Sequence, residues 1–256
     1  MLQLFGALGA GTMRGLQQMG QMALLLGSAC GWLLRRPFRI RLFFKQMEFV
    51  GVHSGFVVIL TGLFTGMVLA LQTYYAFRMF SAESLVGATV ALSMTRELGP
   101  VITALMVTGR AGSAMAAEIG TMRVTEQVDA LEVMAINPVQ YLVTPRLLAG
   151  MVMLPLLTVI SDFVGIAGGY LVGVKMLGIN SSMFMNKIYD LLELSDIYNG
   201  LTKAVVFGLI LTLVGCYKGF YTSGGAEGVG RSTTQAVVLA SVLILMSDYI
   251  LTALMF

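Results

Sequence analysis

Long apolar stretches alternate with short polar ones along this chain, and their lengths predict membrane-spanning helices. Residues 49–77 contain no Asp, Glu, Lys or Arg, and residues 147–174 contain only Asp162. About 20 consecutive apolar residues are needed to cross a bilayer. The pattern therefore predicts five spans, at about residues 49–73, 85–115, 147–174, 200–217 and 233–255.

The second predicted span is too long for a straight crossing of a hydrocarbon core of about 30 Å. Gly99-Pro100 lies in its middle. Proline has no backbone N–H, so this dipeptide permits a bend or a break in the helix.

The first 34 residues follow a different pattern, with polar and apolar side chains on opposite sides of a helix. The polar side carries Gln3, Arg14, Gln17, Gln18 and Gln21, and the apolar side carries Phe5, Leu8, Leu16, Met19, Ala23 and Leu26. This favours an amphipathic helix in the plane of the membrane interface, and a short extra span over Leu16–Leu34 is the alternative. We therefore expect an all-α integral membrane protein with an interfacial segment (residues 1–45) and a transmembrane domain (residues 46–256).

Basic residues precede the first span and predict its orientation. They are Arg35, Arg36, Arg39, Arg41 and Lys45. Because positive charge favours the cytoplasmic side of a membrane, we expect a cytoplasmic N-terminus. Five spans then leave the C-terminus on the outer side.

Composition excludes a soluble domain. The chain is 57% hydrophobic and 11% charged, whereas soluble domains carry about 25% charged residues. The net charge of +3 is modest, and we expect no nucleic-acid partner. Cys30 and Cys216 are far apart in apolar surroundings, as is typical of inert cysteines.

The sequence does not favour an enzyme. His53 is the single histidine, and no His, Cys or carboxylate cluster has metal-ligand spacing, so we expect neither catalytic nor metal-binding residues. The phosphate-loop pattern G-x-x-x-x-G-K-[ST] is absent, and the glycines of residues 225–230 are most simply a flexible turn. If ATP drives this protein, another chain binds the ATP and Mg²⁺.

Four ionisable residues lie within the predicted spans, in the half of the membrane opposite the N-terminus: Arg96, Glu97, Lys203 and Asp248. A charge at the bilayer centre costs roughly 2.5–3.5 kcal/mol on insertion scales, so these side chains must pair or line a wet cavity. One interpretation is a salt-bridge network that joins three helices. The other is a polar site for the head group of an amphiphile, with an arginine binding a phosphate.

An apolar stripe ends the first span beside these charges. Leu69, Thr73, Ala76 and Phe80 recur at helical spacing, next to several aromatic residues. An aromatic belt at the membrane interface explains this pattern, and a slot for acyl chains is the alternative.

Residues 118–146 form a charged connection between the second and third spans. Within it, residues 126–134 read as a short helix with Val128, Leu131 and Met134 at three-residue spacing. It is either a solvated loop helix or a projection that docks into a cytoplasmic partner.

Small residues recur at the spacing of packed membrane helices. The sets are Gly51/Gly55, Gly62/Gly66 and Gly165/Gly169/Gly173. Such faces let helix backbones approach closely, so we expect a tight helix–helix seam within the chain or across a dimer.

Several of these motifs together resemble the MlaE/YrbE permease family. They are residues 96–100 (RELGP), 109–113 (GRAGS), 117–122 (AEIGTM), 126–131 (EQVDAL), Pro138, residues 141–146 (YLVTPR) and 248–254 (DYILTAL), with Gly62, Gly66 and residues 67–69. The resemblance runs in order over about residues 50–256.

The resemblance implies the permease of an ABC transporter that moves phospholipid between the inner and outer membranes of a Gram-negative cell. It implies a homodimer with ATPase subunits, a STAS-domain protein and a periplasmic ring of MCE-domain proteins. The charged cluster Arg96, Glu97, Lys203 and Asp248 would lie at the lipid cavity. The residues that would couple to the ATPase are Glu126, Gln127, Val128, Asp129, Ala130, Leu131 and Met134. Asp162 has no assigned role.

Two other functions remain as alternatives. One is a membrane scaffold that anchors a cytoplasmic complex without transporting anything. The other is an ion or proton channel, which would need polar residues lining the inner half of the membrane.

Overall fold

The computed structural model describes residues 2–33 and 40–255, and within the first helix it describes the side chains of Met13 and residues 15–32 only. Several residues used in the predictions lie outside the described residues and side chains: Gln3, Phe5, Leu8, Arg14, Arg35, Arg36 and Arg39.

The described part of the chain contains five helical segments long and apolar enough to cross a membrane, as predicted. The segments extend beyond the predicted ends because polar residues continue each helix past its apolar stretch. They are Ile40–Arg78, Glu83–Val124, Val139–Met176, Leu194–Phe220 and Gly225–Met255.

These segments are built from α-helices and short turns of other helix types. The α-helices are α1 (Leu2–Leu33), α2 (Ile40–Met47), α3 (His53–Arg78), α4 (Val86–Ser93), α5 (Gly99–Val107), α6 (Ser113–Val124), α7 (Gln127–Val133), α8 (Thr144–Tyr170), α9 (Ser181–Leu191), α10 (Leu194–Phe220) and α11 (Gly225–Met255). The π-helical turns are η1 (Glu48–Val52), η3 (Met94–Leu98), η4 (Thr108–Gly112), η5 (Val139–Val143) and η6 (Leu171–Met176), and η2 (Glu83–Leu85) is a 3₁₀ turn.

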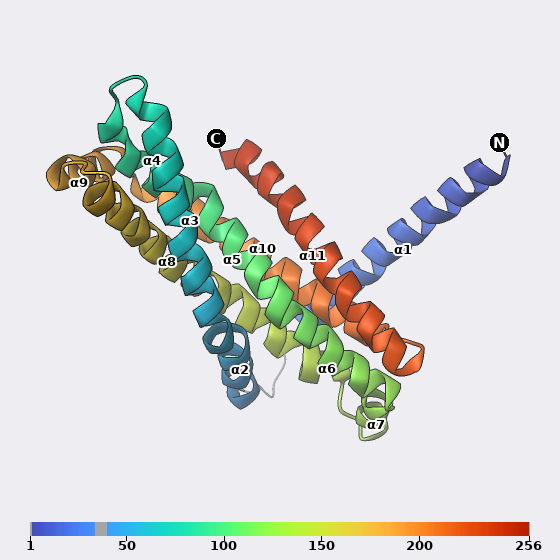
Figure 1. Cartoon of the computed structure of the whole chain (residues 1–256). Helices are drawn as coiled ribbons and strands as arrows, with labels where there is room; N and C mark the ends of the chain where they lie inside the picture. The colour runs from blue at the N-terminus through green and yellow to red at the C-terminus, as the bar shows by residue number, and fades with distance from the viewer. Residues whose placement is uncertain (1, 34–39, 256) are drawn as a thin grey trace.

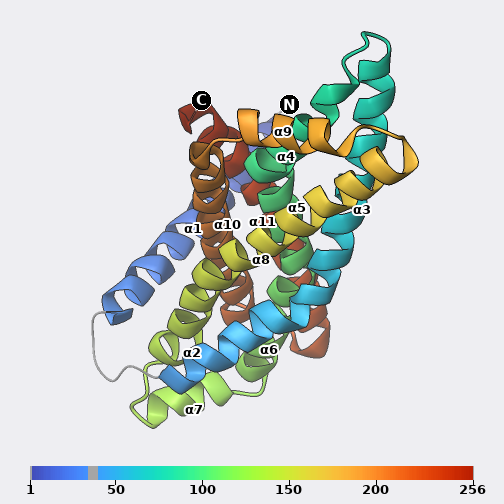
Figure 2. The ribbon, with the colours of Figure 1, turned by 90° about the vertical axis from the view of Figure 1, so that its left-hand side faces the viewer.

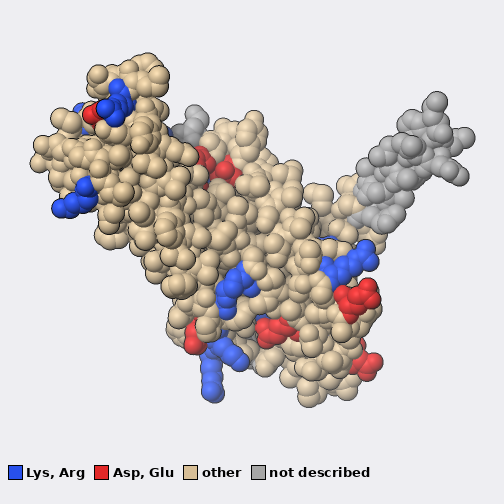
Figure 3. All heavy atoms as spheres, viewed as in Figure 1, with Lys and Arg blue, Asp and Glu red and all other residues tan. Residues whose placement is uncertain are grey.

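The spans pack into one bundle. α8 lies against both α3 and α10, and α11 packs on α10 and α6. α2, α6 and α7 lie at one end of the bundle, whereas α4, α9 and the C-terminus lie at the other (Figures 1 and 2). Charged side chains gather mostly near these two ends of the face in Figure 3, with a broad, largely uncharged band between them.

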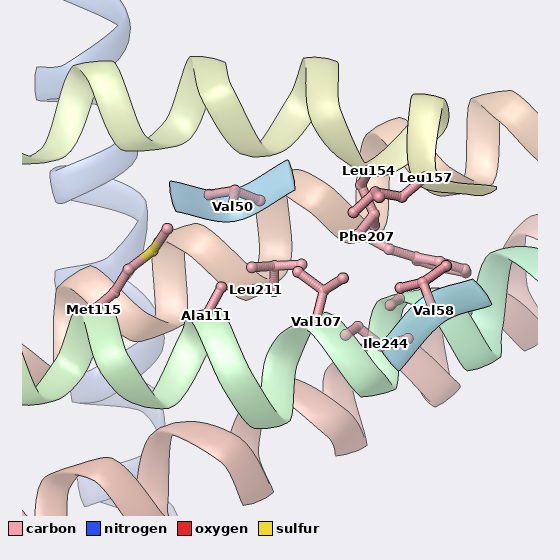
Figure 4. Packing of buried hydrophobic residues seen from close by; sticks show 11 residues of the cluster. Val50, Val58, Val107, Ala111, Met115, Leu154, Leu157, Phe207, Leu211 and Ile244 are labelled. Atoms are coloured by element: carbon pink, nitrogen blue, oxygen red, sulfur yellow. The ribbon is translucent and has the colours of Figure 1, made fainter. Parts of the chain in front are cut away.

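The centre of the bundle is an apolar core between spans distant in sequence. Val50 and Val58 of the first span meet residues of the other four (Figure 4). The buried side chains from those four are Ala104, Val107, Ala111, Met115, Leu154, Leu157, Phe207, Leu211 and Ile244.

The predicted glycine seam lies within the chain, between α3 and α8. A β-carbon on Gly66 would collide with the backbone of Gly165, and one on Gly62 would collide with Ser161. Gly55, by contrast, has open space where a β-carbon would lie. The close approach of the two backbones therefore depends on particular glycines of the predicted sets.

Gly99-Pro100 does not break the second span. The π-helical turn η3 precedes it, and the Gly99 N–H reaches back to the carbonyl of Met94. Such a wider turn accommodates a proline while the helix continues. The span therefore stays a single helical segment from Glu83 to Val124.

The first helix, α1, is continuous, and its second half packs on the bundle. Leu25 and Ala29 are buried against α8, α10 and η5. Gln21, expected on the polar side, accepts a hydrogen bond from the Tyr217 hydroxyl at 2.8 Å. Leu16 and Met19, expected on the apolar side, are exposed in the single chain. The first half of α1 extends away from the bundle (Figure 1).

The prediction of a flexible turn over residues 225–230 is wrong. Gly225 begins α11, and the turn lies before it, with Gly224 at φ +93° and Gly225 at φ +67°. Two glycines in the left-handed region reverse the chain direction, and the later glycines are helical.

The connection between the third and fourth spans also contains a helix that the sequence analysis did not predict. Asn180 caps α9 by accepting hydrogen bonds from the N–H groups of Ser182 and Met183. Phe184 of α9 is fully buried in a cluster with residues of α4. This packing places α9 across the end of the bundle (Figure 2).

Candidate functional site

Lys203 lies at the centre of the charged cluster. Its side chain is fully buried, and its Nζ atom lies 2.7 Å from Glu97 Oε2 and 3.0 Å from Asp248 Oδ1. The three residues come from α10, η3 and α11, so one ammonium group joins three spans. The fourth span was predicted to begin near residue 200, but α10 begins at Leu194. Lys203 therefore lies about 14 Å from the start of the helix, further from its end than predicted.

Two further oxygens surround this ammonium group. Thr252 Oγ1 lies 2.7 Å from Nζ, and the main-chain oxygen of Arg96 lies 3.1 Å from it. In a regular α-helix the Arg96 carbonyl would accept from residue 100, but Pro100 has no N–H to give. Lys203 therefore donates to a carbonyl that the proline leaves without its usual partner.

The side chain of Arg96 is held apart from this cluster. Arg96 Nε lies 2.7 Å from Oδ1 of Asp196, a residue that the sequence analysis did not select. The carboxylate of Asp196 is 2% exposed, and its Oδ2 also accepts from the Glu193 N–H at 3.1 Å. Asp196 thus caps the start of α10 and pairs with Arg96. The spacing of Glu193 and Asp196 is that of a capping box, which is a readable sequence signal.

An open depression of about 310 Å³ lies over Arg96 and Glu97, and Leu92 and Ser93 complete its lining. The side chains of Arg96 and Glu97 are each 37% exposed, whereas their partners Asp196 and Lys203 are buried. The site therefore has a buried layer of fixed charges beneath an accessible pair of opposite charges.

One member of the predicted apolar stripe, Leu69, lines a groove beside the segment that carries Glu97. Leu69 and Leu98 line the same groove of about 360 Å³, together with Phe64, Thr65, Val68 and Gln72. Thr73 Oγ1 donates to the Leu69 carbonyl within α3. Ala76 is exposed, and Phe80 is 79% exposed beyond the end of α3 at Arg78. Leu69, Thr73 and Ala76 thus share one face of α3, whereas Phe80 lies beyond the end of the helix.

Asp162 of α8 faces Gly99 in the second span. A β-carbon on Gly99 would collide with Asp162 Oδ1, so the carboxyl lies directly against the backbone where Pro100 follows. Among the described residues, Asp162 Oδ1 is buried without a hydrogen-bond partner.

The predicted short helix of residues 126–134 is α7, and it starts one residue later than expected. Glu126 precedes it in the left-handed region, at φ 60°. Val128 is buried, whereas Met134 is 61% exposed and Val133 is 87% exposed. Val133 and Met134 therefore form an exposed apolar tip at the end of α7. The three-residue spacing of apolar positions in the sequence had identified Met134 but not Val133.

Two ion pairs hold α7 and its flanks. Arg123 of α6 pairs with Asp129 of α7. Arg146 of α8, 3% exposed, pairs with Glu118 of α6 at 2.8 Å. Together they fix the connection between the second and third spans at the end of the bundle opposite the C-terminus (Figure 1).

Within residues 2–33 and 40–255, no group of three or more His, Cys, Asp or Glu side chains is arranged to hold a metal ion.

Comparisons with known proteins identify the family. Residues 43–254 match the model of the family described as permease MlaE. A probable ABC transporter permease protein of Rickettsia felis is 47% identical over 256 residues, which cover 100% of this chain and 99% of the relative. The intermembrane phospholipid transport system permease protein MlaE of Haemophilus influenzae is 46% identical over 213 residues, covering 83% of this chain and 82% of the relative.

A plant protein is also similar. The chloroplastic protein TRIGALACTOSYLDIACYLGLYCEROL 1 of Arabidopsis thaliana is 41% identical over 212 residues, which cover 83% of this chain and 61% of the relative. The multi-pass helical fold and these matches show that the chain belongs to the MlaE permease family.

Proposed function

We propose that this chain is the membrane subunit of an ABC transporter that moves phospholipids between the inner and outer membranes of a bacterium. The observation that carries the proposal is the layered charge arrangement inside the spans, in which buried Lys203 and Asp196 hold Glu97 and Arg96 beneath an open depression. Family membership and the similarity to the intermembrane phospholipid transport system permease of Haemophilus influenzae support the same conclusion.

Arg96 is the residue that we assign to the phosphate of the lipid. A guanidinium group has five N–H donors in a planar fork that matches phosphate oxygens. Asp196 contacts Nε and fixes the orientation of the side chain, which borders the depression. Glu97, exposed to the same extent beside Arg96, supplies an acceptor for hydroxyl or ammonium groups of a head group.

The groove between α3 and Leu98 is the place that we assign to an acyl chain. It is lined mainly by apolar side chains, and Leu98 directly follows Glu97 in the sequence. Leu69 is the residue of the predicted stripe that lines this groove. Thr73, Ala76 and Phe80 would contact the lipid nearer the membrane surface, at the end of α3.

We assign energy coupling to α7. Its exposed apolar tip, Val133 and Met134, projects at the end of the bundle and fits a groove on a partner ATPase. The sequence has no phosphate-loop motif, so ATP and Mg²⁺ would bind to that partner. The ion pairs Arg123–Asp129 and Glu118–Arg146 would carry force from α7 to the spans.

The assembly that we propose contains two copies of this chain. Most of the apolar part of α11 is exposed in the single chain, including large side chains such as Val242, Leu245 and Tyr249. A second copy would cover part of this surface. ATPase subunits and a STAS-domain protein would lie on the cytoplasmic side with α6 and α7. A ring of MCE-domain proteins would lie on the periplasmic side with the C-terminus, across the inner membrane.

The experiment that tests this function measures ATP-dependent transfer of labelled phospholipid by the reconstituted complex. We expect Arg96→Glu to abolish transfer while the complex still assembles, because reversal of the charge repels both phosphate and Asp196. The matched control is Lys187→Glu in α9, where the exposed Lys187–Asp190 pair is also replaced by like charges. Full transfer by Arg96→Glu would overturn the assignment and favour a scaffold.

A further inference from the structure

A second pocket, lined by both charged and apolar side chains, lies at the end of the bundle opposite the charged cluster. It has a volume of about 680 Å³ and is lined by Arg41, Leu42, Phe44, Lys45 and Glu48 of α2 and η1. α2 leads into the first span at the same end as α6 and α7 (Figure 2).

The lining residues form one helical face with both charge signs. Arg41, Phe44, Lys45 and Glu48 recur at the spacing i, i+3, i+4 and i+7, and all four side chains are exposed. Residues at this spacing are neighbours on a helix surface. The face therefore presents two cations, an aromatic ring between them and a carboxylate one turn further along.

None of the ion pairs formed among the described residues involves Arg41, Lys45 or Glu48. Arg41 and Lys45 are one helical turn apart, so both can contact the same phosphate group. Glu48 follows Lys45 by about 4.5 Å of helical rise. A zwitterionic head group with a phosphate and an ammonium group matches this order of charges.

The position of this face is fixed by contacts with the rest of the bundle. Arg110 donates to the main-chain oxygen of Phe49, the residue after Glu48, and to Ser54 Oγ at 3.2 Å. The Arg110 guanidinium also lies 4.8 Å from the centre of the Phe49 ring. The turn that carries Glu48 is thus anchored to the second span.

Exposed apolar side chains accompany the charges. Ile40 is 62% exposed and Phe44 is 61% exposed, one helical turn apart. A helix that carries basic and large apolar side chains together is suited to the boundary between lipid head groups and acyl chains. The surface therefore fits a lipid better than a purely polar ligand.

We propose that this pocket binds the head group of phosphatidylethanolamine from the membrane leaflet at this end of the bundle. Arg41 and Lys45 contact the phosphate, Glu48 accepts hydrogen bonds from the ammonium group, and Phe44 packs on the glycerol and upper acyl region. This site is distinct from the Lys203 cluster, and its occupancy does not require lipid transport.

The test uses the whole complex in nanodiscs made mainly of phosphatidylcholine. Small amounts of phosphatidylethanolamine or phosphatidylglycerol are added, each with a photoreactive group near the glycerol, and labelling of residues 40–55 is measured by mass spectrometry. We expect Arg41→Gln/Lys45→Gln to reduce labelling by both probes about tenfold, a change of roughly 1.4 kcal/mol in binding. We expect Glu48→Gln to reduce labelling by phosphatidylethanolamine alone.

The control is Arg231→Gln, which removes an exposed cation from α11 and should leave labelling unchanged. Unchanged labelling in Arg41→Gln/Lys45→Gln would overturn the site. Equal losses of both lipids in Glu48→Gln would overturn the ammonium contact. A failure of ATP-dependent transfer in the unaltered complex would count against the proposed function and leave this binding result standing.

Discussion

At the scale of single residues, Lys203 explains how charges are tolerated inside the spans. Two carboxylates, a hydroxyl and a main-chain oxygen surround its ammonium group. An isolated ion buried away from water is very unfavourable, whereas a paired and fully hydrogen-bonded one is tolerated. Lys203 therefore offsets the charges of Glu97 and Asp248 within the spans and gives the Arg96 carbonyl a donor that Pro100 cannot supply.

This role predicts the effect of removing the ammonium group. We expect Lys203→Met to destabilise the protein by about 3–5 kcal/mol, because the two carboxylates and the Arg96 carbonyl lose their common partner. The measurement is thermal unfolding in detergent, followed by the loss of monodisperse protein.

Lys187→Met is the matched control, since the Lys187–Asp190 pair is exposed and should contribute about 0–1 kcal/mol. Equal stability of the two variants would contradict the structural role of Lys203.

The sequence predicted that Arg96, Glu97, Lys203 and Asp248 must pair or line a wet cavity, and the structure shows pairing beside an open depression. The sequence did not predict which of these charged residues pair with each other. Asp196 was missed because it lies before the predicted start of the fourth span, although its capping-box spacing was visible. Val133 was missed because a seven-residue helix is too short for spacing to define its exposed face.

At the scale of elements, close backbone contact holds the α3–α8 pair together. Membrane helices cannot rely on the hydrophobic effect to associate, so small residues that allow close packing matter more than in water. Gly66 and Gly165 are the closest point of this seam.

We therefore predict that Gly66→Leu prevents correct packing of α3 on α8, with a loss of at least the ~1–3 kcal/mol typical of overpacked cores. Gly55→Leu is the control on the same helix, because open space surrounds that position. Yield of folded protein and its thermal midpoint are the measurements. Normal stability of Gly66→Leu would show that the two helices can separate without cost.

Apolar length was sufficient to predict the five spans, because the bilayer sets that length. Details that depend on packing were not predicted. α9 is stabilised by burial of Phe184 against α4, which local sequence does not reveal. The turn before α11 was misplaced because glycines inside a helix and glycines in a turn look alike in a sequence.

At the scale of the whole molecule, two specialised ends are joined by continuous helices. α10 carries Asp196 and Lys203 near one end and Tyr217, which contacts α1, near the other. The second span carries Arg96 and Glu97 as well as Glu118 and Arg123. A movement of α7 would therefore reach the charged cluster through a span that contains two π-helical turns.

This arrangement predicts a separation of functions. We expect Val133→Asp/Met134→Asp to reduce ATPase binding at least about tenfold, because charged groups would replace the exposed apolar tip, while bound phospholipid is retained. Co-purification of the ATPase and lipid extraction measure the two effects. Normal ATPase binding by this double variant would exclude α7 as the coupling element.

The measurement that tests the central claim most directly is native mass spectrometry of the complex purified gently from its own membranes, with Arg96→Glu in parallel. The account predicts two copies of this chain, ATPase subunits and bound phospholipid, with the same proteins but less phospholipid in the variant. A chain that carries neither ATPase nor phospholipid, or a variant that retains all its lipid, would contradict it.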